Sequence, residues 1–386
     1  MKKVKKQEVE IDYLLVGVIS GLFLFSLLAV YSGSGQYETA DPYYFVKRQV
    51  IWYLIGTVAM IAVARFDYEL LERLAIPFYA LGVALLVLVH FFGTYRNGAQ
   101  RWISFGLFEV QPSEFMKVGL ILFLAVILKK VGGQRMTFVE SIPLTAKLAV
   151  FTIIPFALVL IQPDLGSALV IAAVLFTLLV VSGISYKMIL LMLAMFSGLI
   201  GFLVFMHNHF FELFIKVIKP HQLDRVYGWL NPTEFSSSYG YQTTQAILGI
   251  GSGELSGSGF NQGSQVQSGR IPEAHTDFIF SVIGEEFGFI GSVILITLYF
   301  LLIYRLILIA MNTSNMFGVY IIAGVTGLIA FQVFQNIAMT IGLMPVTGLA
   351  LPLVSYGGSA LLTNMIALGL VFSIQIRSKK FMFGNE

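Results

Sequence analysis

Long apolar segments recur along this chain and constrain its fold more than any other feature. A helix needs about 20 predominantly apolar residues to cross the hydrocarbon core of a bilayer. We expect ten such segments, the second and fourth of them short, at residues 13–31, 50–64, 74–92, 115–128, 148–162, 166–183, 188–207, 278–303, 317–341 and 357–376. Only 12% of the 386 residues are charged, against about 25% in soluble domains. The pattern predicts an all-α polytopic membrane protein with ten transmembrane helices.

The distribution of lysine and arginine predicts the orientation of these helices. Short cytoplasmic loops of membrane proteins carry an excess of both residues. With the N-terminus inside, the cytoplasmic segments hold fifteen of them and the short outer loops hold four. The run 13–31 follows Lys2, Lys3, Lys5 and Lys6 and is too long for a cleaved signal. Ten spans return the basic tail with Lys379 and Lys380 to the inside, so both termini are expected to be cytoplasmic.

This topology places residues about 208–277 outside the membrane, as one long loop between the seventh and eighth helices. Residues 210–219 are apolar with lysines, as in an amphipathic helix that lies in the membrane interface. Residues 249–269 are rich in Gly, Ser and Gln, so we expect a mobile segment. The chain has no GxxxxGK[ST] loop and no cysteine, which argues against nucleotide use and excludes thiolate chemistry.

A carboxylate stands where this loop enters the eighth apolar segment, in the run His275-Thr276-Asp277. Ionisable groups at the edge of hydrocarbon are costly and are therefore functional candidates. Projected as a helix at 100° per residue, residues 277–288 place Asp277, Ser281, Gly284 and Gly288 on one small polar face, with Glu285 beside them. The alternatives are a helix-capping aspartate and a structural histidine. An HExxH zinc motif is absent.

Two further charged clusters are predicted to face outward. Residues 97–103 contain Arg101 and Trp102, and residues 111–117 contain Glu114 and Lys117, which are three apart and share a helical face. They form either an ion pair that anchors a short span or, with Arg101, a site for a lipid phosphate. Asp164 either caps the sixth helix or helps to line a polar cavity.

An uncharged segment at residues 336–359 contains two prolines and several glycines at the outer membrane face. Irregular backbone at that depth is tolerated only where protein or a water-filled cavity shelters it. The segment is therefore either a re-entrant structural loop or a cavity wall that supplies backbone and hydroxyl groups, Ser355 and Tyr356 among them.

Together these clusters describe an outer-leaflet cavity with a carboxylate, basic residues and apolar walls, which suits an amphiphile with an anionic head. The carboxylate could act as a general base toward a sugar hydroxyl. Arg, Lys or a divalent cation would then stabilise a lipid pyrophosphate leaving group. The same cavity could instead translocate the amphiphile, and composition and spacing leave both possibilities open.

Four long motifs occur in one order along the chain, and they resemble the SEDS family (shape, elongation, division and sporulation) that includes RodA, FtsW and SpoVE. They are NGAQRWI with QPSEFMK, QPDLGSAL, PEAHTDFIFSVIGEEFGF and QNIAMTIGLMPVTGLALPLVSYGGSALL. The resemblance covers essentially all of residues 1–386 as a single transmembrane domain. NGAQRW and the short tails are closer to RodA.

The resemblance implies a peptidoglycan glycosyltransferase of the bacterial plasma membrane, which polymerises lipid II into β-1,4 glycan strands for cell elongation and shape. It implies that Asp277 is the essential aspartate, which activates the GlcNAc 4-hydroxyl directly or by holding a divalent cation such as Mg or Mn. The implied substrate-binding residues are Arg101, Trp102, Glu114, Lys117, Asp164, His275, Thr276, Ser355 and Tyr356. Arg101 and Lys117 would offset the charge of the undecaprenyl pyrophosphate that leaves.

Two other classes of function remain open at the level of the sequence. A lipid II flippase would need polar groups in the inner half of the membrane, where charges occur only in loops. A non-enzymatic scaffold of the cell-wall machinery is the other alternative. The resemblance implies a class B penicillin-binding protein as the transpeptidase partner, within an elongation or division complex, and no nucleic acid.

Overall fold

The computed structural model describes residues 12–37, 41–96, 99–104, 106, 109–218, 220–232, 234 and 239–378. Several residues on which the predictions above depend lie outside the described residues: Lys2, Lys3, Lys5, Lys6, Asn97, Gly98, Lys219, Lys379 and Lys380.

Ten long helices within the described ranges coincide with the ten predicted segments. They are α1 (Tyr13–Gly33), α2 (Tyr44–Arg65), α3 (Leu71–Phe92, after the 3-10 turn Tyr68–Leu70), α4 (Pro112–Lys129), α5 (Phe138–Ile161), α6 (Leu165–Val181), α7 (Tyr186–His209), α13 (Gly288–Met311), α14 (Met316–Thr340) and α15 (Gly358–Ser378). Eight are long and apolar enough to cross a membrane. The other two are α4, which carries three charged residues, and α6, which has 17 residues. The all-α polytopic fold is confirmed, and the count of ten spans stays a prediction.

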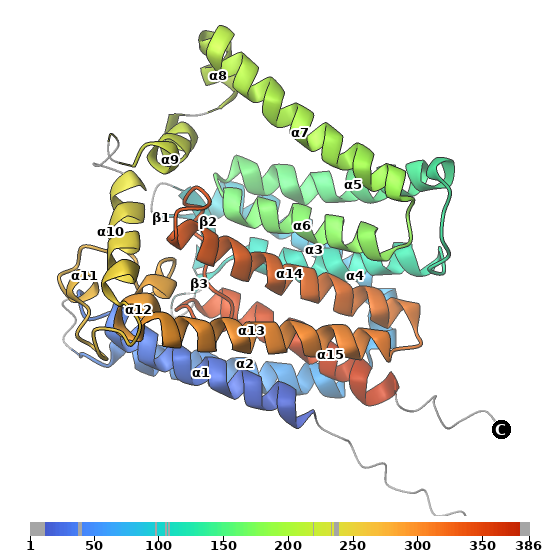
Figure 1. The fold of residues 1–386 in the computed structure, drawn as a ribbon. Helices are drawn as coiled ribbons and strands as arrows, with labels where there is room; N and C mark the ends of the chain where they lie inside the picture. The colour runs from blue at the N-terminus through green and yellow to red at the C-terminus, as the bar shows by residue number, and fades with distance from the viewer. Residues whose placement is uncertain are drawn as a thin grey trace, which may run out of the picture.

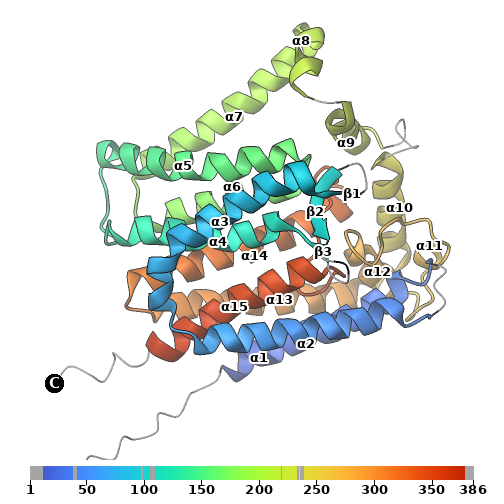
Figure 2. The ribbon, with the colours of Figure 1, turned by 180° about the vertical axis from the view of Figure 1, so that it is seen from behind.

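The long helices run side by side in one bundle, with α14 and α15 enclosed and α7 at the edge (Figures 1 and 2). In α14 and α15, 72% of the membrane-length window is buried, against 6% in α7. In both views α7 runs obliquely away from α5 and α6, and Met188 is its buried residue. The core therefore lies around the inner helices, while α7 presents its apolar sides to the surroundings of the bundle.

Two helices begin more than one helical turn before the start that the apolar pattern predicted. The second starts at Tyr44 rather than at residue 50, and the fifth starts at Phe138 rather than at residue 148. A search for continuous apolar segments misses these starts, because polar or charged residues interrupt the first three turns, at Lys47, Arg48 and Gln49 in α2 and at Glu140, Ser141 and Lys147 in α5. For α5 the start is set by a capping box, in which Thr137 and Glu140 bind each other's backbone N–H groups.

The predicted eighth helix is divided in two, which corrects the helical projection of residues 277–288. The short helix α12 (Ile279–Glu286) ends at Phe287, and α13 begins at Gly288. Gly288 has a φ of 62°, and a Cβ there would clash with the backbone nitrogen of Gly257. Asp277 precedes α12, so the predicted face shared with Ser281 and Gly284 is not formed.

The long loop folds into short helices at one end of the bundle (Figure 1). They are α8 (Phe211–Val217), α9 (Pro220–Leu230), α10 (Tyr239–Ser252), α11 (Ser264–Gln267) and α12. Helices α10, α11 and α12 share an apolar cluster with the segment before α12 and with the loop after α14; it is made of Ala246, Val266, Ile271, Ala274, Phe278, Val282 and Val346. Helix α8 falls within the predicted amphipathic helix. The segment at 249–269, which was expected to be mobile, contacts α12: Ser258 N and Gly259 N donate to the carbonyls of Glu285 and Glu286 at 2.9 and 3.1 Å.

A small antiparallel sheet with the strand order β1-β2-β3 was not predicted. It consists of β1 (Thr94–Arg96), β2 (Ala99–Ser104) and β3 (Glu109–Val110), and it connects α3 to α4. Its strands have two to six residues, too few for a period of two to stand out. The sheet places Arg101 and Trp102 on its middle strand.

The two ends of the bundle differ in what they carry. Helix α1 begins and α15 ends at the end opposite to α10, α11 and α12 (Figures 1 and 2). This agrees with the prediction that both termini lie on one side of the membrane. The compartment that this end faces stays a prediction.

Candidate active site

Asp277 lies just before α12, and a buried amide fixes its position. The Asn336 side chain, on α14, donates from Nδ2 to the carbonyl of Asp277 at 2.8 Å and to the carbonyl of Leu349 at 2.7 Å. Phe278, the next residue, is buried in the apolar cluster that includes Ala246, Val266 and Val346. Asp277 is therefore held between α14, the loop at 341–357 and the outer layer of short helices.

The residues around Asp277 bring together four predicted site positions. Ser355 Oγ donates to the carbonyl of Thr276 at 2.5 Å, and Tyr356 N donates to the carbonyl of His275 at 2.9 Å. The His275 ring is buried, and its centroid lies 4.9 Å from that of Tyr37, 4.6 Å from that of Phe45 and 5.5 Å from that of Tyr356. Backbone hydrogen bonds and aromatic packing thus hold the Asp277 segment against the loop at 341–357.

The Asp277 carboxylate faces a glycine. Gly348 has a φ of 75°, and a Cβ on it would lie 3.3 Å from Asp277 Oδ2. Asp277 itself is half-buried. Because glycine carries no side chain, it leaves room beside the carboxylate where a larger residue would crowd a reacting group.

Several charges act on this carboxylate, which lies outside the membrane-spanning helices. Burial disfavours its charged form most strongly, Glu273 and Asp164 add like-charge repulsion, and Arg225 and Arg101 oppose the shift. The net result raises the pKa of Asp277 to about 7. At that pKa a carboxylic acid exchanges a proton near neutral pH, as a general acid or base must.

Arg101 and Asp164 meet at the turn between α5 and α6. Arg101 donates from Nε to the carbonyl of Gln162 at 2.9 Å and from Nη2 to the carbonyl of Pro163 at 2.5 Å, and its Nη1 lies 3.9 Å from Asp164 Oδ1. The predicted cap is confirmed, because Asp164 Oδ1 accepts from Ser167 N at 3.1 Å. Its Oδ2 accepts from Gln111 Nε2 at 3.0 Å. Asp164 thus caps α6 and joins the turn to Arg101 and the start of α4.

Glu114 and Lys117 form the predicted pair on one face of α4. Lys117 Nζ lies 2.7 Å from Glu114 Oε1, and the two residues are 1% and 4% exposed. The pair is enclosed by protein, as charges inside a membrane protein must be. Trp102 is half-buried on β2, and its carbonyl accepts from Thr94 Oγ1 at 3.1 Å.

Two of the four charged residues that act on Asp277 were not predicted to belong to the site: Glu273 and Arg225. Glu273 has a φ of 53°, and its Oε2 accepts from Thr276 Oγ1 at 3.0 Å. Arg225, on α9, donates from Nη1 to the carbonyls of Val346 and Thr347 at 3.2 and 3.4 Å. These contacts with Val346 and Thr347 join residues more than 100 positions apart, so no local pattern announces them.

Glu285 and Glu286 have a structural role in α12. Glu285 accepts from the backbone N–H groups of Gln265 and Val266 at 2.7 and 3.0 Å. Glu286 accepts from Asn261 N at 3.0 Å and from the Ser32 hydroxyl. Both carboxylates are buried, so they tie the glycine-rich segment before α12 to the bundle.

The predicted role of Asp277 as a metal ligand stays a prediction. Among the described residues, no group of three or more His, Asp or Glu side chains is arranged to hold a metal ion. Asp277 and Glu273 offer two carboxylates. Mg²⁺ is commonly bound by one or two carboxylates together with substrate phosphates and water.

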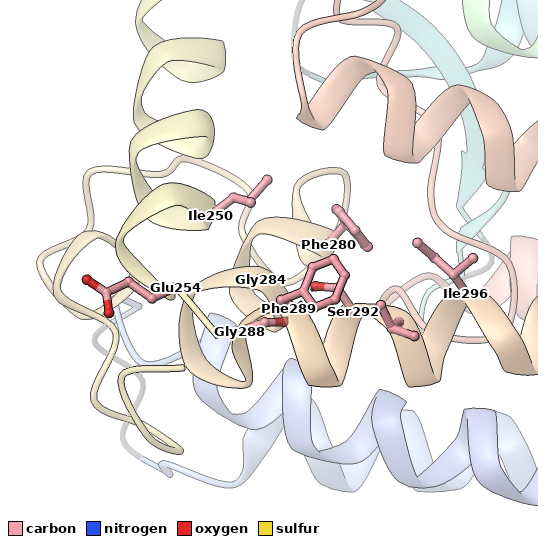
Figure 3. Close-up of a pocket in the computed structure, with 9 residues that line it drawn as sticks. Ile250, Glu254, Phe280, Gly284, Gly288, Phe289, Ser292 and Ile296 are labelled. Carbon is pink, nitrogen blue, oxygen red and sulfur yellow. Dashed lines mark hydrogen bonds between the residues drawn. The ribbon is translucent and has the colours of Figure 1, made fainter. Parts of the chain in front are cut away.

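An apolar hollow of about 270 Å³ lies between α10, α12 and α13 (Figure 3). Ile250, Phe280, Gly284, Phe289 and Ile296 are among the residues that line it. Its charged lining residue, Glu254, points its carboxylate away from the others (Figure 3). None of the predicted site residues lines this hollow.

Comparison with known proteins gives one consistent result for the sequence. Residues 12–380 match the family model described as cell cycle protein, for FtsW, RodA and SpoVE. The chain is similar to the probable peptidoglycan glycosyltransferase FtsW of Trichlorobacter lovleyi, with 36% identity over 95% of this chain and 93% of that protein. It is also similar to the peptidoglycan glycosyltransferase MrdB of Escherichia coli, with 34% identity over 98% and 97% of the two chains.

The fold is similar to solved structures over nearly its whole length. A chain from a structure titled "Structural coordination of polymerization and crosslinking by a peptidoglycan synthase complex" matches with a TM-score of 0.78 and 29% identity, over 98% of this chain and 100% of that one. The rod shape determining protein RodA of Thermus thermophilus matches with a TM-score of 0.68 and 29% identity, over 95% and 97%.

Proposed function

The chain belongs to the family of cell cycle proteins that includes FtsW, RodA and SpoVE and is a peptidoglycan glycosyltransferase, and we propose that Asp277 is the general base of its reaction. The observation that carries this assignment is the position of the Asp277 carboxylate, beside Gly348 and within a cluster of four other charges. A base must be able to reach the proton that it removes and must titrate near the working pH.

The reaction joins two lipid-linked sugars. Asp277 takes the proton from the 4-hydroxyl of a GlcNAc on one lipid II molecule, and that oxygen forms a bond to C1 of MurNAc on the growing chain. The bond from C1 to the diphosphate breaks, and undecaprenyl diphosphate leaves with the electron pair. Because the attack comes from the opposite face, an α-linked donor yields a β-1,4 glycan. The diphosphate bond supplies the driving force, so no nucleotide is required.

In the alternative in which Asp277 holds a divalent cation such as Mg or Mn, the carboxylate acts through the ion rather than as the base itself. Asp277 and Glu273 would be its protein ligands, and the substrate diphosphate would complete its coordination. When bound, the ion would supply positive charge to the leaving group. The protein's own contribution is to hold Asp277 through Asn336, Ser355 and Tyr356 in a fixed position.

We propose a role in cell elongation with a class B penicillin-binding protein as partner. The likeness to RodA of Thermus thermophilus supports elongation, and the likeness to a chain of a peptidoglycan synthase complex supports a crosslinking partner. The chain would lie in the bacterial plasma membrane with both termini in the cytoplasm. The excess of Lys and Arg in the segments expected to be cytoplasmic supports this orientation.

Polymerisation of lipid II by the purified protein, together with its partner transpeptidase, tests the assignment. Asp277→Asn keeps the size of the side chain and removes the base, so we expect glycan strands to fall to the background level. Asp41→Asn removes a carboxylate that is 41% exposed on its side chain and serves as the matched control. Wild-type polymerisation by Asp277→Asn would reject the role of Asp277. If lipid II crosses liposome membranes and no polymer forms with the wild type, a flippase is the better description.

A further inference from the structure

The two cations expected to neutralise the leaving group are both occupied by other parts of the protein. Arg101 directs Nε and Nη2 to the carbonyls of Gln162 and Pro163, and its Nη1 lies near Asp164. Lys117 is 1% exposed and paired with Glu114. A diphosphate that separates from a sugar needs preorganised positive charge where its own charge develops. Arg225 is another cation that acts on Asp277.

Arg225 and Asp277 lie against consecutive residues of the loop at 341–357. Arg225 Nη1 contacts the carbonyls of Val346 and Thr347, and Asp277 Oδ2 lies beside Gly348. The start of α6 meets this segment too, because a Cβ on Gly166 would lie 3.1 Å from the carbonyl of Thr347. Residues 346–348 therefore bring the guanidinium of α9 to the candidate base and to the turn that holds Asp164.

Helix α9 holds Arg225 firmly. Trp229, one helical turn later, donates from Nε1 to the carbonyl of Gly342 at 2.8 Å. Residues 225 and 229 therefore both bind the loop at 341–357 from one face of the helix. Leu223 is buried. Tyr227 OH lies 2.7 Å from His207 Nε2, which links α9 to the end of α7. Arg225 thus sits on a helix anchored on two sides and is itself half-buried.

We propose that Arg225 binds the diphosphate of the lipid-linked substrate and neutralises the charge that develops as it leaves. This inference rests on the proposed glycosyl transfer and adds a residue to it. Arginine suits the task because its planar guanidinium presents five donors and matches phosphate oxygens in pairs. The two carbonyls of Val346 and Thr347 orient the group through Nη1, and a guanidinium that is oriented in advance loses less freedom when a ligand binds.

A purely electrostatic role beside Asp277 makes a different prediction. The positive charge of Arg225 lowers the pKa of Asp277, so its removal would move the pH profile of the reaction to higher pH. Such an effect would leave the affinity for the diphosphate unchanged. Affinity and pH profile therefore separate the two roles.

The direct test is binding of undecaprenyl diphosphate to the full-length Asp277→Asn protein, which we expect to bind substrate without the base. We expect Arg225→Gln in this background to weaken binding roughly tenfold or more, the effect of losing hydrogen bonds to a charged group. Arg225→Lys should restore part of the loss.

Arg270→Gln removes an exposed arginine from the same outer region and should bind undecaprenyl diphosphate like the Asp277→Asn parent. Undecaprenol, which lacks the diphosphate, shows whether the apolar chain alone binds and should not respond to Arg225→Gln.

The active protein supplies a second readout. With Asp277 intact, Arg225→Gln should raise the KM for lipid II at every pH. An unchanged KM with a shifted pH profile would overturn the proposal, as would unchanged affinity for undecaprenyl diphosphate. Equal loss of undecaprenol binding would show a general structural defect and would overturn it as well. If Asp277→Asn itself polymerises lipid II, the general base is misassigned, whereas the binding result for Arg225 still stands or falls on its own.

Discussion

The single residue Asp277 shows how a carboxylate can be poised for proton transfer at the surface of a membrane. The like charges of Glu273 and Asp164 are opposed by the two arginines at 225 and 101, and burial is the largest influence. The charges act in both directions, and desolvation, the largest influence, raises the pKa of Asp277. The pKa of Asp277 is raised to about 7, which gives both protonation states a share at neutral pH.

This shift predicts the pH dependence of the reaction. Only the deprotonated carboxylate can accept a proton, and its population rises as the pH passes upward through about 7. We expect kcat/KM to rise about tenfold per pH unit below that value and to level off above it. Initial rates of lipid II polymerisation between pH 5 and about 9 would measure this profile.

The neighbours of Asp277 make the assignment testable. Glu273 raises the pKa of Asp277, so Glu273→Gln should move the midpoint of the profile to lower pH. Tyr37 also faces this group, but burial and the charge of Glu273 raise its own pKa above the usual value, so it stays protonated over this range. A midpoint that moves to higher pH in Glu273→Gln would exclude Asp277 as the titrating group.

At this scale the sequence predicts residues that carry their own local signal. Asp277 could be found because it stands where an apolar segment begins, and the Glu114–Lys117 pair because its spacing matches a helical turn. Arg225 and Glu273 could not be found in this way. Their importance arises from contacts between α9, the loop at 341–357 and the segment before α12, which exist only in the folded chain.

Among the elements, the short helix α12 holds two other segments in place through its two glutamates. Glu285 binds the N–H groups of Gln265 and Val266 at the start of α11, and Glu286 binds Asn261 N and the Ser32 hydroxyl. One short helix therefore fastens both the glycine-rich segment and the end of α1. Because Asp277 immediately precedes α12, this fastening also limits where the carboxylate can move.

Replacement of Glu285 by Gln should loosen the glycine-rich segment. The amide keeps one acceptor oxygen and places an NH₂ group against backbone N–H donors, which should cost about 1–3 kcal/mol. We expect a lower melting temperature and faster proteolytic cleavage within residues 253–269 of the purified protein. Glu254→Gln, which changes an exposed carboxylate nearby, is the control. Identical cleavage in the two variants would show that Glu285 does not hold the segment.

The elements differ in how far the sequence determines them. Continuous apolar runs predict the long helices, because a membrane-length helix pairs all its backbone N–H and C=O groups within itself, as lipid requires. Charged residues near the starts of α2 and α5 interrupt the apolar pattern, and the break at Gly288 lies inside the apolar segment predicted at 278–303. The strands β1 to β3 were missed because they depend on pairing across the sheet rather than on a local pattern.

The whole molecule is organised as a bundle with an outer layer of short helices at one end (Figure 1). The candidate site lies where this layer meets the bundle, with contributions from the α5–α6 turn, α9, the Asp277 segment and the loop at 341–357. A lipid-linked sugar suits such a boundary, since its chain can stay in the membrane while its head reaches the outer layer. The sugar head can reach Asp277 from the outer leaflet only if the end of the bundle with Asp277 faces away from the cytoplasm.

That orientation can be measured directly because the chain contains no cysteine, so single cysteines can be labelled without background. Ser268→Cys lies beside α11, and Gln134→Cys lies between α4 and α5; both positions are exposed. In intact spheroplasts, a membrane-impermeant maleimide should label Ser268→Cys at once and Gln134→Cys only after the membrane is permeabilised. The positive-inside distribution requires this order. The reverse order would place Asp277 in the nucleotide-containing compartment and remove the reason for a lipid diphosphate as the energy source.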